Sequence, residues 1–157
     1  MQTTIILDRR QHAEAIIEKL KAGLDAALAR FPVEIAYLHG SVARGTPLSD
    51  SDVDLALVLS EPLPPPMERL KLEFEIQDAI AEVCELKAVD ARAINRAPLN
   101  VQGEIVQEGK CLYVRNQEFK ADFLPKHMTT YEKLCNLSGK ILKVKPDAKR
   151  AAEIQEA

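Results

Sequence analysis

Residues 39–54 read His-Gly-Ser-Val-Ala-Arg-Gly-Thr-Pro-Leu-Ser-Asp-Ser-Asp-Val-Asp, and this stretch indicates both the fold and the chemistry of the protein. Gly40 and Ser41 follow one apolar run, and Asp52 and Asp54 open the next, at residues 55–59. Because buried charge is costly unless it is paired or bound to metal, packing alone does not account for the two carboxylates. A turn that admits a phosphate, beside carboxylates that hold a divalent cation, predicts phosphoryl or nucleotidyl transfer.

The composition is that of an ordinary globular protein. The chain has 157 residues, of which 46% are hydrophobic and 29% charged, with a formal net charge of −3. This length suits one domain, so we treat residues 1–157 as a single unit. No long Lys/Arg block, signal-peptide core or membrane-length apolar run is present. We therefore expect no membrane association, no direct nucleic-acid binding and a cytoplasmic location.

Hydrophobic periodicity predicts a small sheet covered by helices. Apolar residues at helical spacing predict four helical segments, at residues 11–30, 67–85, 101–107 and 118–143. Short apolar runs predict four strands, at residues 33–38, 53–59, 86–94 and 110–114. Asp8 is the expected N-cap of the first helix, and the charged tail at 145–157 is expected to be loosely ordered. The expected fold class is α+β (α/β), a small mixed β-sheet flanked by helices.

The alternation of side chains along a strand places Asp52 and Asp54 on one face, together with Ala56 and Val58. Two such carboxylates can converge on cations that lie roughly 3.5–4 Å apart in two-metal sites. Mg²⁺ favours carboxylate oxygens combined with water and substrate phosphates. Without a metal the two charges repel, and one carboxylate tends to hold a proton.

The Gly-Ser turn is a candidate phosphate site. Gly40 permits close backbone approach, and free amides at the start of a helical turn over residues 42–44 attract phosphate oxygens. The hydroxyl of Ser41 and the guanidinium of Arg44 can add charge-assisted bonds to the same group. Arg44 is equally well interpreted as a surface arginine, and His39 as a packed or turn histidine.

Asp90 is the candidate for a third acid. It interrupts the apolar run that follows the strand of Asp52 and Asp54 in chain order. There it can complete a metal site or accept a proton from an attacking hydroxyl. The alternative is a plain edge-strand or turn aspartate.

Gly40-Ser41, ten residues and then Asp52-Val53-Asp54 resembles the GSx10DxD signature of the minimal nucleotidyltransferases of the polymerase-β-like superfamily. The sequence of residues 40–45, Gly-Ser-Val-Ala-Arg-Gly, is similar to that of the MntA-type antitoxins in this group. Asp90 and the later residues 95–98, Asn-Arg-Ala-Pro, resemble the family's third-carboxylate strand and its trailing Asn-x-Ala-Pro. The resemblance runs from about residue 31 to residue 114, which is taken as the core of the fold.

The resemblance implies ATP as donor, two Mg²⁺ ions, and transfer of AMP with release of pyrophosphate. Asp52 and Asp54 would bind both metals, Asp90 would bind the catalytic one and help deprotonate the acceptor, and Gly40 and Ser41 would hold the triphosphate. Arg92 departs from the family, which often carries an apolar residue there. It shares a strand face with Asp90, so it either pairs with that carboxylate or contacts the nucleotide.

For MntA-type members the acceptor is a tyrosine of a partner HEPN/HepT-type toxin, which AMP transfer silences. We therefore expect a metal-dependent nucleotidyltransferase that acts as the antitoxin of a two-component module. Two alternatives stay open. One is a nucleotidyltransferase of small molecules such as aminoglycosides, and the other is a non-catalytic antitoxin that neutralises its toxin by binding.

Overall fold

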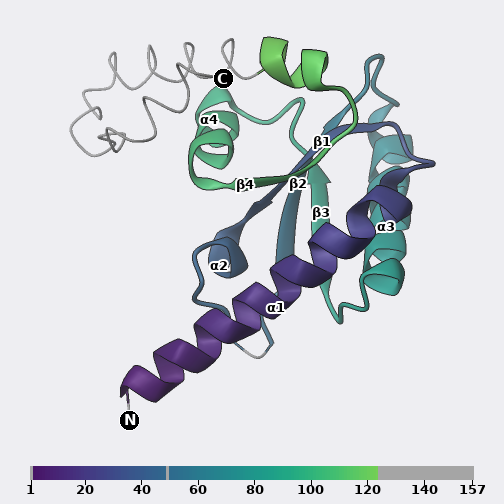
Figure 1. Ribbon diagram of the computed structural model, residues 1–157. Coiled ribbons are helices and arrows are strands. Elements are labelled where there is room, and N and C mark those ends of the chain that lie inside the picture. Colours follow the sequence, from purple (N-terminus) through teal and green to yellow (C-terminus); the bar gives the residue numbers. More distant parts are fainter. Residues whose placement is uncertain (1, 49, 124–157) are drawn as a thin grey trace, which may run out of the picture.

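The computed structural model describes residues 2–48 and 50–123 as a four-stranded sheet with helices on both faces (Figure 1). A further helical segment starts at residue 117 and continues to residue 123. In chain order the elements are α1 (Gln2–Leu28), β1 (Val33–His39), α2 (Gly40–Ala43), β2 (Val53–Leu59), α3 (Pro66–Val83), β3 (Val89–Ala93), α4 (Leu99–Glu108) and β4 (Lys110–Val114). Within these ranges no helix is long and apolar enough to cross a bilayer.

The sheet is mixed, and its strands run in the order β3-β2-β1-β4. β1 pairs antiparallel with both β2 and β4, whereas β2 and β3 are parallel. Parallel neighbours need a crossover connection, and α3 supplies it between β2 and β3. The predicted fold class, a small mixed sheet flanked by helices, is confirmed.

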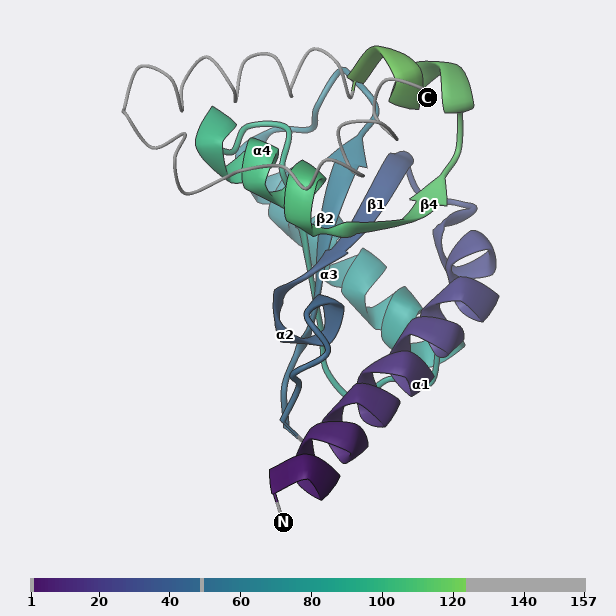
Figure 2. The ribbon, with the colours of Figure 1, turned by 60° about the vertical axis from the view of Figure 1, so that its left-hand side comes forward.

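Each face of the sheet carries its own apolar cluster. α1 and α3 cover one face, where they pack on Leu55 and Leu57 of β2, and α4 lies over the other face (Figure 2). There Ile105 of α4 packs with Ala56 and Val58. The strand residues therefore alternate between the two clusters as predicted, and Asp54 lies on the face of Ala56 and Val58.

Several element boundaries differ from the prediction. α1 starts at Gln2, so Asp8 lies inside the helix and is not its N-cap. Residues 2–10 contain neither glycine nor proline, and the helix continues through them although residues 3, 4 and 6–10 are exposed and the buried stripe starts at Ala13. The predicted helix over 118–143 is confirmed only to residue 123; its remainder and the tail at 145–157 are outside the described residues.

β3 starts at Val89 and not at residue 86, because α3 ends in a left-handed turn. Glu85 has a φ of 55°, and the amide of Leu86 donates to the carbonyl of Ala81 at 2.9 Å. The amide of Glu85 donates to the carbonyl of Glu82, which completes a Schellman motif. Glycine is usual at the left-handed position, so a glutamate there gave no sequence signal.

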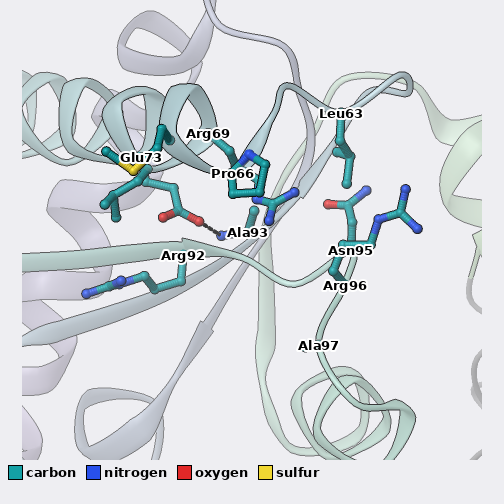
Figure 3. A pocket seen from close by; sticks show the side chains of 11 residues that line it. Leu63, Pro66, Arg69, Glu73, Arg92, Ala93, Asn95, Arg96 and Ala97 are labelled. Carbon is teal, nitrogen blue, oxygen red and sulfur yellow. Dashed lines mark hydrogen bonds between the residues drawn. The ribbon is translucent and has the colours of Figure 1, made fainter.

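A buried carboxylate from α3 closes the outer edge of β3. Glu73 is 7% exposed, and its Oε1 accepts a hydrogen bond from the amide of Ala93 at 2.9 Å (Figure 3). Directly after β3, the side chain of Asn95 bonds both the amide and the carbonyl of Leu59 at 2.9 Å. These bonds fix the end of β3 against β2 and α3.

Replacing Glu73 with alanine should lower the free energy of unfolding by about 1–3 kcal/mol, because the amide of Ala93 then lacks an acceptor. Glu73→Gln should cost less, since its amide oxygen can still accept this bond. Urea unfolding followed by circular dichroism measures both. Equal stability of the alanine variant and the parent would contradict the assigned hydrogen bond.

Candidate active site

Three titratable side chains form a row across three neighbouring strands. His39 at the end of β1 is the register partner of Asp54 on β2, and Asp54 is the register partner of Asp90 on β3. Neighbouring strands lie about 4.8 Å apart, and paired residues point to the same face. The structure thus brings Asp90 beside Asp54, as the prediction requires.

His39 was not among the predicted site residues. It follows Ile35 and Tyr37 at alternate positions of β1, and both of those pack in the cluster on the face of Asp54. This period-two pattern was the available signal that His39 shares that face. The imidazole is half-buried beside the two carboxylates.

The Gly40 turn packs directly on Asp54. Gly40 has a φ of +76°, which disfavours any residue with a side chain, and a Cβ built there would collide with Oδ2 of Asp54 and lie 3.2 Å from its Cγ. Ser41 follows in α2, and its carbonyl accepts a bond from the amide of Thr46 at 2.9 Å. Arg44 ends α2 with an exposed side chain. The predicted helical turn after Gly40 is confirmed.

Asp52 lies at the entrance of β2, exposed, and borders a cavity of about 460 Å³. Asp90 and Arg92 of β3 line the same cavity, together with Phe74 and Gln77 of α3. The lining includes neither Gly40 nor Asp54. The cavity therefore opens along the outer edge of β3, next to two of the three predicted acids.

The pKa values of Asp54 and His39 are both shifted in the direction that favours the neutral side chain. Burial raises the pKa of the Asp54 carboxyl above its usual range, and the neighbouring charges of Asp90 and Asp52 act in the same direction. Burial also lowers the pKa of His39, against the opposite effect of Asp54 and Asp90. An incoming cation would relieve the repulsion between the carboxylates.

The pKa of His39 should lie below the usual histidine value, and Asp54→Asn should lower it further, because the charge of Asp54 favours the imidazolium. Titration of the histidine ring protons by NMR, without metal, measures this. A His39→Gln variant assigns the signal. A higher His39 pKa in the Asp54→Asn variant would contradict the arrangement.

Arg92 pairs with Asp90, which is the first of the two roles that the sequence left open for this arginine. Its Nε donates to Oδ1 of Asp90 at 2.9 Å, and the two side chains are 57% and 43% exposed. A pair this exposed contributes at most about 1 kcal/mol, so the carboxylate can be released at little cost. In the described part of the chain, no three His, Cys, Asp or Glu side chains are grouped as metal ligands.

A sequence profile described as "Polymerase beta, Nucleotidyltransferase" matches residues 18–118, which include all of the predicted site residues. The chain belongs to the polymerase beta nucleotidyltransferase family. The prediction of a nucleotidyltransferase is thereby confirmed. No curated protein matches the chain.

Several solved structures resemble this nucleotidyltransferase. A toxin-antitoxin structure with AMP-PNP has a TM-score of 0.54 and 23% identity, covering 83% of this chain and 95% of that chain. A mutant of the toxin-antitoxin MntA-HepT has a TM-score of 0.55 and 23% identity, covering 76% and 92%. A tri-AMPylated Shewanella oneidensis HEPN toxin in complex with an MNT antitoxin has a TM-score of 0.48 and 21% identity, covering 71% and 82%. The first two share the fold described above.

Proposed function

We propose that this nucleotidyltransferase moves AMP from ATP to a tyrosine hydroxyl of a HEPN/HepT-type toxin and thereby acts as its antitoxin. The observation that carries the proposal is the register pairing of Asp54 with Asp90, beside the Gly40 turn. The family match over residues 18–118 supports the reaction class. The similar toxin-antitoxin structure with AMP-PNP supports an adenine nucleotide as donor and a toxin as partner.

The donor set of Asp52, Asp54 and Asp90 fits Mg²⁺, because all three offer only oxygen ligands. Burial raises the pKa of Asp54, and the charges of Asp90 and Asp52 add to that rise, so a bound cation would favour its ionised form. When bound, the metal supplies positive charge to the triphosphate. Asp90 would hold the metal once its Oδ1 is released from Arg92 or is shared with it.

The remaining steps belong to residues of the chain. Gly40 lets the turn pack against the carboxylate of Asp54, and the Ser41 hydroxyl donates to the triphosphate beside the charge of Arg44. Asp90 accepts the proton of the acceptor hydroxyl. The freed oxygen bonds to the α-phosphorus, the bond to the β-phosphate oxygen breaks, and pyrophosphate leaves with that electron pair.

Incubation with Mg²⁺, α-labelled ATP and a HEPN-type toxin protein tests the proposal. The parent should transfer label to the partner, and Asp52→Asn/Asp54→Asn should not, while both remain folded. Equal labelling by the double variant would overturn the metal-site assignment. Toxin neutralisation without any label would favour the non-catalytic alternative.

Mg²⁺ with ATP should raise the Tm of the parent by mass action, and the gain should grow with ligand concentration. The clustered carboxylates motivate this expectation, since ATP alone adds negative charge beside them. Differential scanning fluorimetry with Mg²⁺, ATP or both measures it. An unchanged Tm at saturating Mg²⁺ and ATP would count against nucleotide binding.

A further inference from the structure

Figure 3 shows the residues that line a second cavity, of about 490 Å³, which lies next to the first along the outer edge of β3. Arg92 lines both cavities. On α3, Leu70 and Glu73 line the second cavity and Phe74 and Gln77 line the first. The two cavities are therefore adjoining parts of one groove between α3 and β3. We call it the β3 groove.

The second cavity is rich in positive charge. Arg69 of α3, Arg92 of β3 and Arg96 of the following turn all line it. Glu73 also lines it, but this buried carboxylate already accepts the bond from the amide of Ala93. Within residues 2–48 and 50–123, the guanidinium groups of Arg69 and Arg96 have neither an ion pair nor a hydrogen bond. These cations gather on a chain whose net charge is −3, which fits an acidic ligand.

The same groove is bordered by exposed apolar side chains. Met67, Leu70 and Phe74, at helical spacing on α3, are 78%, 36% and 51% exposed. Contiguous exposed apolar groups rimmed by polar ones mark interaction surfaces. A phosphate backbone would leave these groups in water, whereas a peptide that alternates apolar and acidic side chains would cover them. The combination therefore favours a protein ligand over a nucleic acid.

We propose that the β3 groove docks an acidic segment of the acceptor protein, with an apolar side chain of that segment seated against Met67 and Leu70. This inference rests on the proposed function, because its ligand is the protein that receives AMP. A segment held by Arg69 and Arg96 continues along β3 toward Asp52 and Asp90, which line the far part of the groove. Docking there brings the acceptor hydroxyl to the carboxylates.

The test compares two double charge reversals. Arg69→Glu/Arg96→Glu changes the groove, and Lys71→Glu/Lys110→Glu makes the same change in net charge at exposed positions outside its lining. The groove variant should raise the KM for the HEPN-type partner by roughly tenfold or more and leave kcat within about twofold. The Tm gain with Mg²⁺ and ATP should stay that of the parent. The control variant should match the parent throughout.

Binding of the partner, measured by calorimetry without ATP, separates this inference from the proposed function. If the parent binds the partner without labelling it, the proposal of AMP transfer fails. Docking is still supported in that case if the groove variant has a tenfold higher Kd for the partner than the parent. Equal binding by the groove variant and the parent overturns docking. A parent that neither binds nor labels the partner overturns both.

A milder variant and an RNA probe complete the test. Arg69→Gln/Arg96→Gln keeps the folded surface polar, and its partner binding should weaken less with added salt than that of the parent. An unchanged salt dependence overturns the charge contribution.

A fluorescent single-stranded RNA should not bind the parent. Binding of RNA that the groove variant loses would overturn the proposal in favour of a nucleic-acid ligand.

Discussion

Replacing Asp54 with asparagine is expected to lower AMP transfer by about a thousandfold or more while stabilising the ligand-free protein at neutral pH. The loss of transfer follows from the place of Asp54 between His39 and Asp90, where its charge is needed to hold a cation. The gain in stability follows from the raised pKa of its carboxyl, which burial and the charges of Asp90 and Asp52 produce. The same charge thus serves the reaction and destabilises the fold.

The sign of the pH dependence follows from that direction. Since the pKa of Asp54 is higher in the folded protein than in the unfolded chain, the folded state loses stability as the pH rises from the usual carboxyl pKa through the raised one. Asparagine has no charge to desolvate, so the variant lacks this loss. The Asp54→Asn variant should therefore have a larger free energy of unfolding than the parent at neutral pH, and this difference should vanish below the usual pKa of aspartate.

Urea unfolding at several pH values, in EDTA, together with the labelled-ATP assay, checks both parts. Asp50→Asn is the matched control, because Asp50 is an exposed turn residue that precedes β2. It should leave both activity and stability near those of the parent. An Asp54→Asn variant that transfers AMP normally, or that is less stable than the parent at neutral pH, would contradict the account of this carboxylate.

Gly40→Ala should lower the rate of AMP transfer by roughly 100-fold or more, whereas Gly45→Ala should leave the rate nearly unchanged. Both glycines have positive φ, +76° and +75°, so alanine costs about 1 kcal/mol of backbone strain at either position. Only at Gly40 does the new Cβ collide with the carboxylate of Asp54. At Gly45 nothing lies within 4 Å of it.

The comparison separates backbone strain from displacement of the carboxylate. Transfer rates and urea midpoints for both variants give the two quantities, and Gly45→Ala reports strain alone. Similar activity of the two variants would show that the contact between Gly40 and Asp54 has no part in the reaction.

The sequence predicted those parts of the site that depend on local rules. Glycine and serine after an apolar run, and alternation along residues 53–59, placed the turn and the face of Asp54 correctly. Asp90 was proposed because its strand follows that of Asp52 and Asp54 in chain order, and the parallel register of the two strands, which aligns it with Asp54, became known only from the structure.

Other features depend on tertiary contacts that no local pattern carries. The ion pair of Arg92 with Asp90 was one of two open alternatives, since two residues on one strand face can pair or point to a ligand. The β3 groove joins residues of α3 to the turn after β3, and only the packing of that helix brings them together. The left-handed backbone at Glu85 makes β3 start later than predicted, and no glycine in the sequence indicated this turn.

Mass spectrometry of the HEPN-type partner co-expressed with this chain tests the central claim most directly. The account predicts AMP on a tyrosine of the partner when the parent chain is present, and none with Asp52→Asn/Asp54→Asn, which still carries Arg69 and Arg96 of the β3 groove. An unmodified partner with the parent, or the same AMP adduct with the double variant, would contradict it.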